Sequence, residues 1–238
     1  MSGTDGSSVV VTGAGRGIGR ALALQLAAGG DHVVAVARTA ADLESLAAEA
    51  PTGSVTPLSG DVADPRTHAA AAAAAEVAGR PRAWVNDAAV VDPRPLLETS
   101  DEDLDAVLDI NLRGAFLGCR VALRLLAAAG GGTILNVGSL SGVAHVEKFA
   151  GLATYTVSKA GVHALSEAVA VEGRPLGVRC ICLAPGAVDT AMLRRAAPHL
   201  RAGVSPEQVA AIAVFLLSAV AAPLSGSTIP MFTNLEPG

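Results

Sequence analysis

The sequence predicts a single α/β domain, residues 1–238, in which a doubly wound parallel sheet of about seven strands carries helices on both faces. Short runs rich in β-branched residues alternate with longer runs rich in Ala and Leu from end to end, which is typical of repeated strand–helix units. The 238 residues suffice for one large domain. No linker or change in composition divides them.

The expected strands are the short apolar runs, and the expected helices fill the intervals. The strands lie at about 8–12, 32–37, 54–60, 83–86, 132–139, 178–184 and 227–231. The helices lie at about 17–28, 40–50, 64–78, 100–128, 153–173 and 205–219. The longest stretch without a regular pattern, 185–208, follows the sixth strand. Loops at the carboxyl ends of strands are where such sheets place ligand contacts.

Composition argues against several classes of protein. No run approaches the ~18 apolar residues that indicate a membrane span, and the N-terminus lacks a secretory pattern. The net charge of −5 provides no basic surface for nucleic acid. The five histidines and three cysteines lack metal-ligand spacing, and Cys180 and Cys182 alternate in an apolar run, as buried side chains do. We therefore expect a soluble, cytoplasmic protein with no metal, nucleic-acid or membrane partner.

A glycine-rich turn joins the first strand to the first helix. Its glycines are Gly13, Gly15, Gly17 and Gly19. They allow a backbone to approach a pyrophosphate at the helix N-terminus, where free N–H groups and the helix dipole favour an anion. The strict Gly-x-Gly-x-x-Gly spacing is not met, because Ile18 or Arg20 stands at the third glycine position. The place of the turn in a strand–turn–helix unit nevertheless indicates a dinucleotide site in a Rossmann fold.

The end of the second strand favours NADP(H) over NAD(H). A carboxylate there would hold a ribose 2′-hydroxyl and repel a 2′-phosphate. The strand instead ends in Arg38, and the first acid is Asp42. Arg38 and Arg16 could clamp a 2′-phosphate. The alternative is that both are ordinary solvated arginines and that the cofactor is NAD(H).

The only tyrosine, Tyr155, lies four residues before Lys159, one of two lysines. Residues four apart share a face of a helix and can meet at one ligand. A phenol with a pKa of ~10 is a poor acid or base at neutral pH, and a nearby ammonium lowers that pKa by ~1–3 units. Considered alone, the two residues could equally be a surface pair without function.

Together with the glycine turn, this pair resembles the signature of the short-chain dehydrogenase/reductase family, in particular its 3-oxoacyl-(acyl-carrier-protein) reductase-like members. The resemblance covers nearly the whole chain. Further segments match in the expected order: "GDV" at 60–62, "INLRGAF" at 110–116, "NVGSLSG" at 136–142 and "APGAVDT" at 184–190.

The resemblance implies roles for four catalytic residues. Ser139 would polarise the substrate oxygen and Tyr155 would exchange a proton with it. Lys159 would lower the pKa of Tyr155 and bind the nicotinamide ribose, and Asn111 would organise a relay water. With the two arginines, the expected cofactor contacts are Gly13, Arg16, Gly17, Ile18, Gly19, Arg38, Asp61, Val62, Asn86, Ala88, Tyr155, Lys159, Pro185, Gly186, Val188 and Thr190.

Two departures from the family pattern bear on the site. The usual Asn-Asn-Ala-Gly reads "NDAA" at 86–89, so Asp87 replaces an asparagine. The interval from Ser139 to Tyr155 is about three residues longer than usual, which makes Ser141 a rival for the serine role, although Ser139 is preferred from its place at the strand end. The extra residues lengthen a loop at 143–153.

The function expected from this resemblance is NADP(H)-dependent interconversion of a ketone and a secondary alcohol, with Met192 and Leu193 as candidate substrate contacts. The alternatives are an NAD-linked alcohol dehydrogenase, a 3-oxoacyl thioester reductase, an enzyme that epimerises or dehydrates with tightly held cofactor, and a non-catalytic cofactor-binding sensor. A homotetramer or homodimer built through the helices at 100–128 and 153–173 is also expected.

Overall fold

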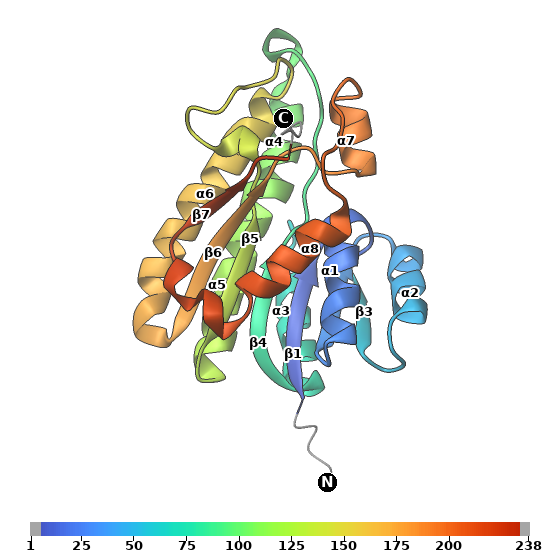
Figure 1. Cartoon of the computed structure of the whole chain (residues 1–238), viewed down its shortest axis with the longest axis vertical. Helices are drawn as coiled ribbons and strands as arrows, with labels where there is room; N and C mark the ends of the chain where they lie inside the picture. The colour runs from blue at the N-terminus through green and yellow to red at the C-terminus, as the bar shows by residue number, and fades with distance from the viewer. Residues whose placement is uncertain (1–5, 234–238) are drawn as a thin grey trace.

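A computed structural model describes residues 6–233 and forms a seven-stranded, wholly parallel sheet in the order β3-β2-β1-β4-β5-β6-β7. Helices cover both faces of the sheet (Figure 1). The strands are β1 (Ser7–Thr12), β2 (His32–Ala37), β3 (Val55–Ser59), β4 (Arg80–Asn86), β5 (Gly132–Val137), β6 (Val178–Pro185) and β7 (Thr228–Met231). The predicted fold class and all seven predicted strands are confirmed.

The helices agree with the prediction except at two places. They are α1 (Gly17–Ala28), α2 (Ala40–Glu49), α3 (Pro65–Ala78), α4 (Asp101–Leu108), α5 (Gly114–Ala128), α6 (Ala153–Gly173), α7 (Ala191–Ala196) and α8 (Pro206–Leu216). Short helical turns are η1 (Leu96–Glu98), η3 (Leu140–Gly142), η4 (Arg174–Leu176) and η5 (Ala219–Leu224). The predicted helix 100–128 is divided by a π-helical turn, η2 (Asp109–Arg113), and the segment expected to be irregular, 185–208, contains α7 and a bridge between Val188 and Val204.

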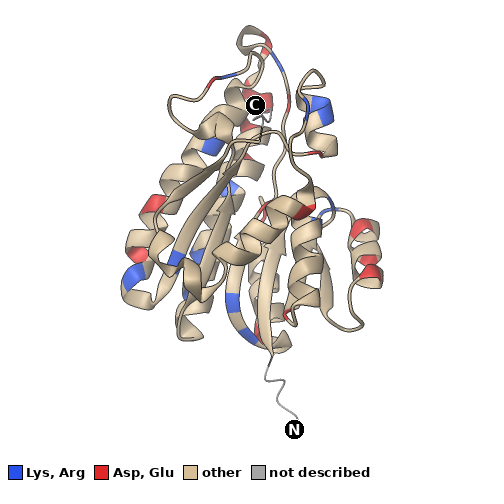
Figure 2. Cartoon of the chain, in the orientation of Figure 1, with Lys and Arg blue, Asp and Glu red and all other residues tan. Residues whose placement is uncertain are grey.

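Alternate side chains of β1 enter two separate cores. Val9 and Val11 pack in the cluster that includes α1, α2 and α8, whereas Val10 packs in the cluster that includes α3, α5 and α6. This period-2 division is what a sheet covered on both faces requires. Charged residues lie mainly on the helices and loops, and the central strands carry few of them (Figure 2).

A buried polar network ties β4 and β5 to the helices behind them. The Trp84 indole donates to Asn86 Oδ1 at 2.9 Å, the Asn86 amide donates to Asn136 Oδ1 at 2.8 Å, and the Asn136 amide donates to Ser166 Oγ at 2.8 Å. Close approach of α5 depends on Gly118, where an added Cβ would lie 2.1 Å from Asn86 Oδ1. The network fixes the relative positions of the elements that end at the cavity of the candidate site.

Two sequence-based expectations about burial and membranes can be compared with this structure. Cys180 and Cys182 are buried, as predicted, and so is Cys119. Within residues 6–233, no helix combines the length and apolarity needed to span a bilayer.

Candidate active site

A cavity of about 800 Å³ lies along the carboxyl edge of the sheet. It collects the glycine turn after β1, the residues at the carboxyl ends of β2 to β7, the start of α6, and α7. Figure 1 shows α7 beyond the carboxyl ends of the strands. The volume falls in the range of small-molecule sites, ~300–1,000 Å³, and this edge is where open α/β sheets bind ligands.

The glycine turn places the N-terminus of α1 against the end of β4. Gly13 has a φ of 74°, and a Cβ at this position would lie 2.8 Å from the Ala88 nitrogen. A Cβ on Gly19 would lie 2.5 Å from the Gly13 carbonyl oxygen. Side chains at either glycine would therefore push the helix away. The close packing leaves the first N–H groups of α1 beside the cavity, where they can receive an anion.

Tyr155 and Lys159 lie on the first turns of α6, and both line the cavity together with Ser139 from the end of β5. The phenol and the Ser139 hydroxyl share a side-chain hydrogen bond. The buried Lys159 ammonium donates to the Val137 carbonyl at 2.7 Å and lies 5.8 Å from the centre of the Tyr155 ring. The chain thus brings a phenol, a hydroxyl and an ammonium to one place.

Ser139 and Ser141 both line the cavity but differ in environment. Ser139 is buried, and its Oγ accepts the Ser141 N–H at 3.2 Å, which caps the turn η3. Ser141 is more exposed. Of the two, Ser139 is the one whose hydroxyl is bonded to the phenol of Tyr155.

The pKa of Tyr155 differs from the value expected from the sequence. Burial raises the pKa of the phenol to about 12, the Ser139 hydrogen bond lowers it, and the negative charge of Asp87 raises it further. The expectation that Lys159 would bring this pKa down is therefore not met by the protein's own groups. Burial dominates because removing a phenolate from water is costly, and the charge of Asp87 adds to that cost.

Asp87 faces the same cavity from the segment after β4. Its carboxylate accepts the Gly19 N–H at the start of α1. Burial raises the pKa of Asp87 to about 6, while the Lys159 charge and the Gly19 hydrogen bond lower it. Burial also lowers the pKa of Lys159, and Asp87 raises it. The two groups therefore hold each other charged across the cavity.

Asn111 lies in the π-helical turn η2, and its side chain holds the segment beyond Asp87. Its Oδ1 accepts the Val90 N–H at 2.8 Å, and its Nδ2 donates to the Val90 carbonyl at 2.9 Å and to Ser158 Oγ at 3.1 Å. Ser158 in turn donates to the Tyr155 carbonyl at 2.7 Å. Such π-helical turns are frequent at functional sites. Here the side chain connects the cavity wall to the helix that carries Tyr155.

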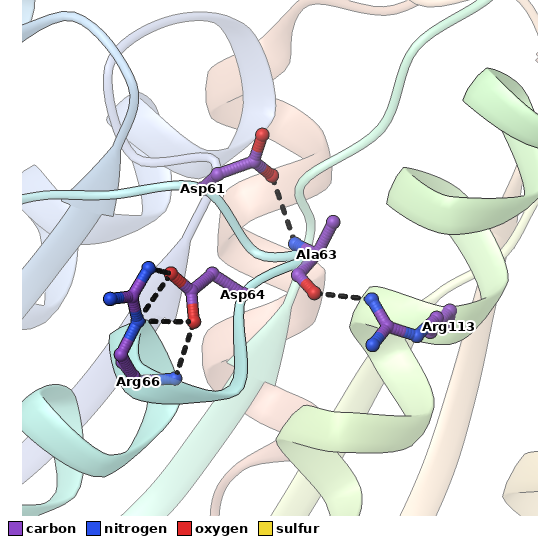
Figure 3. A network of polar contacts seen from close by, with 5 residues as sticks. All are labelled: Asp61, Ala63, Asp64, Arg66 and Arg113. Carbon is purple, nitrogen blue, oxygen red and sulfur yellow. Dashed lines mark hydrogen bonds and ion pairs between the residues drawn. The ribbon is translucent and has the colours of Figure 1, made fainter.

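One end of the cavity lies at the carboxyl ends of β2 and β3. Arg16, Arg38, Asp42 and Asp61 line it, and Val62 closes it. Asp61 accepts the Ala63 N–H at 2.9 Å, and the Ala63 carbonyl accepts a hydrogen bond from Arg113 of η2 (Figure 3). Within residues 6–233, neither the Arg16 nor the Arg38 guanidinium forms an ion pair.

The other wall comes from the segment after β6. Pro185, Gly186, Val188 and Thr190 all line the cavity. Thr190 caps α7 by accepting the Leu193 N–H at 3.2 Å. Its methyl group would lie 3.5 Å from a Cβ on Gly17, so the start of α7 stands opposite the glycine turn.

Three of the predicted site residues do not line the cavity. Asn111 acts from behind it, Gly19 packs against Gly13, and the Asn86 side chain points into the buried network between β4 and β5. Both ends of the Asn86 amide are occupied by the network, so its side chain does not reach the cavity where the cofactor contact is expected. The remaining predicted cofactor and catalytic residues line the cavity together.

Sequence reasoning missed several parts of the site. The Val137 carbonyl that receives Lys159 has no signature, because any residue supplies a carbonyl. Phe149 and Phe232 line the cavity from a loop and from the end of β7. The position of Phe232 directly after a predicted strand could have indicated it.

Comparisons with known proteins identify the family to which the chain belongs. The short chain dehydrogenase family matches residues 7–201. Galactitol 2-dehydrogenase (L-tagatose-forming) of Cereibacter sphaeroides is 36% identical over 94% of this chain and 93% of its own. Carbonyl reductase (NADPH) 2 of Sus scrofa is 35% identical over 94% of each chain. The structure of 3-ketoacyl-(acyl-carrier-protein) reductase from Brucella melitensis complexed with NADH superposes with a TM-score of 0.85 at 29% identity, covering 95% of this chain and 97% of that one.

The chain therefore belongs to the short chain dehydrogenase family. It is an oxidoreductase of the class that acts on alcohols and ketones.

The raised pKa of Asp87 predicts that the stability of Asp87→Asn relative to the wild type increases with pH. The carboxyl titrates near 3.8 when unfolded and near 6 when folded, so between these values the folded state binds more protons and the wild type loses stability as the pH rises. Above pH 6 the wild type carries the full free-energy cost of the ionised carboxylate in the folded state. The difference in free energy of unfolding between Asp87→Asn and wild type should therefore rise by about 2 kcal/mol between pH 4 and pH 8. Urea unfolding at both pH values measures it, and a difference that does not change with pH would contradict the assignment.

Proposed function

We propose that the chain interconverts a ketone and a secondary alcohol by hydride transfer with NADP(H), using Tyr155 as the proton donor and acceptor. The observation that carries the proposal is the convergence of Tyr155, Ser139 and Lys159 on one cavity, with the phenol bonded to the serine and the ammonium 5.8 Å from its ring. A phenol, a hydroxyl and an ammonium at these positions are suited to protonating an oxygen while that oxygen is held by a second donor.

The cavity fits a dinucleotide. The start of α1 presents N–H groups to an anion, and Arg16 and Arg38 line the far end. Such a cofactor supplies the hydride when bound, and the protein supplies orientation and proton transfer. Ser139 and Tyr155 hold the substrate oxygen between them, and the phenol gives its proton to that oxygen in reduction. With a pKa of about 12, the phenol is protonated at neutral pH, which suits the reductive direction.

The preference for NADP(H) rests on the two arginines. Both are exposed at the end of the cavity near the carboxyl end of β2. Neither forms an ion pair with an acidic side chain within residues 6–233. Asp42 lines the same end and would repel a phosphate there. One relative is named for NADPH and one structural neighbour holds NADH, so NAD(H) is the alternative to be tested.

Other functions have less support. A 3-oxoacyl thioester reductase would use the same residues, and one neighbour is such an enzyme. A sensor without catalysis would not need Ser139, Tyr155 and Lys159 to converge, and an epimerase or dehydratase would form product without net turnover of cofactor. We further propose a cytoplasmic location and a homodimer or homotetramer built through α5 and α6. The exposed Phe116 and Val157 on these helices support that assembly, and light scattering would test it.

Arg38→Ala should weaken NADPH binding about 10–100-fold and leave NADH binding nearly unchanged. A hydrogen-bonded charge pair is worth about 1.5–3 kcal/mol, and only the 2′-phosphate provides the partner. Fluorescence titration of both nucleotides measures this. Arg66→Ala is the matched control, because Arg66 is exposed, pairs with Asp64 and does not line the cavity. Tighter binding of NADH than of NADPH by the wild type would overturn the preference.

Tyr155→Phe should lower kcat for ketone reduction by about 10²–10⁴-fold, the usual contribution of a positioned acid. The substitution removes only the hydroxyl, so the Kd for NADPH should stay within a few-fold of the wild type. Steady-state rates and the same titration separate the two effects. Retention of most of the activity by Tyr155→Phe would exclude the phenol as the proton donor.

Ser139→Ala and Ser141→Ala distinguish the two serines. Ser139 shares a hydrogen bond with the phenol, so its replacement should lower kcat/KM at least about 10-fold. Ser141 contributes a backbone N–H to the turn, and this donor survives in the alanine variant, so its replacement should change kcat/KM less than about 3-fold. The reverse order would assign the role to Ser141.

A further inference from the structure

The cavity has two ends with different chemistry. The sheet order places the ends of β1, β2 and β3 on one side and the ends of β5, β6 and β7 on the other. The glycine turn and the two arginines occupy the first side, whereas Tyr155 and Ser139 lie toward the second. If the proposed function is correct, on which this inference rests, the substrate occupies the part of the cavity beyond Tyr155 on the side of β7 and α7.

The walls of this substrate end are apolar and come from four separate segments. They are Leu140 after β5, Val146 and Phe149 in the loop before α6, Met192 and Leu193 in α7, and Phe232 after β7. An added Cβ on Gly186 would lie 2.9 Å from Leu140 Cδ1, so this leucine packs on the turn after β6. Most of these side chains are partly buried although they line a cavity.

Two contacts close the substrate end. The Phe149 and His199 rings pack edge to face with their centres 6.4 Å apart. This contact joins the loop before α6 to the segment after α7. Arg195 of α7 donates to the Val91 carbonyl at 2.5 Å. These contacts hold α7 and the loop before α6 beside the substrate end, so both segments can contact a substrate there.

Few polar side chains line this end. Glu147 is exposed, and Arg194 forms an ion pair with Asp189 on the surface. Ser141, Thr190 and Thr233 also line the cavity, and Thr190 accepts the Leu193 N–H in the cap of α7. Tyr155 and Ser139 provide the two donors that one substrate oxygen needs.

We infer that the substrate is a ketone or secondary alcohol whose reacting carbon carries hydrocarbon groups, and not a polyol or sugar. Hydroxyls beside the reacting carbon would leave water for walls of Leu, Val, Phe and Met, where few partners remain. An apolar pocket discriminates against an added hydroxyl by about 10²-fold. Hydrocarbon substituents gain the same walls as contact surface.

The direct test compares two six-carbon secondary alcohols, hexan-2-ol and galactitol, with the full chain and with both NADP⁺ and NAD⁺. The kcat/KM for hexan-2-ol should exceed that for galactitol by at least about 10²-fold. Equal or higher kcat/KM for galactitol would overturn the inference.

A binding measurement separates this inference from the proposed function. Saturation-transfer NMR on the protein with NADP⁺ should detect hexan-2-ol but not galactitol at equal concentration. Binding of hexan-2-ol without turnover would refute the proposed function and support the apolar site. Transfer to galactitol alone, or to neither alcohol, would overturn the inference whatever the activity.

A substitution locates the effect. Met192→Gln places an amide in the substrate end on a side chain of nearly the same length. It should lower kcat/KM for hexan-2-ol about 10-fold and reduce the ratio of kcat/KM for hexan-2-ol to that for galactitol. Val77→Gln is the matched control, because Val77 is exposed near the end of α3, and α3 returns the chain to the edge of the sheet opposite the cavity. An unchanged preference in Met192→Gln would place the substrate elsewhere.

Discussion

The buried ammonium of Lys159 is the group on which the arrangement of the site depends. Its hydrogen bond to the Val137 carbonyl joins α6 to the end of β5, and β5 continues into Ser139 while α6 carries Tyr155. A second contact, from the Ser139 N–H to His163 Nε2 of α6 at 3.4 Å, joins the same two segments, so the serine and the tyrosine are held side by side. A buried ammonium is stable only where its charge is balanced. The sheet edge supplies the carbonyl, and the segment after β4 supplies the negative charge of Asp87.

Asp87 changes the electrostatic character of the site. An asparagine would donate and accept hydrogen bonds without charge, whereas the carboxylate raises the pKa of both Lys159 and Tyr155. Its position at the Gly19 N–H also places a negative charge at the start of α1, where the helix dipole favours anions. The N-terminus of α1 therefore stabilises the Asp87 carboxylate, and the same helix end would also favour the pyrophosphate of a bound dinucleotide.

The sequence was sufficient for the strands, the helices and the main convergence, since period-2 and Ala/Leu patterns encode them and the carboxyl edge of a parallel sheet gathers the loops that leave its strands. It failed where tertiary contacts decide. Asn86 lies at a strand end like a site residue, but a neighbouring tryptophan and a second asparagine draw its amide into the interior. The turn η2 is not encoded by periodicity, because Asn111 is held by the Val90 backbone rather than by its helix. α7 was missed because six residues carry too little pattern, and its position depends on Arg195 reaching a carbonyl 104 residues away.

The residues that surround Tyr155 also determine the protonation state of its phenol. Apolar residues line the cavity together with Tyr155, and desolvation of the phenol there raises its pKa to about 12. A phenol so held releases its proton only to an oxygen that is gaining negative charge, as a carbonyl does when it is reduced. By microscopic reversibility, the same phenol would accept the proton when an alcohol is oxidised, so its pKa sets the protonation state from which the proposed reaction begins and not the direction of the reaction. The proposed apolar substrate site and the protonated phenol are therefore two consequences of the same apolar surroundings of Tyr155.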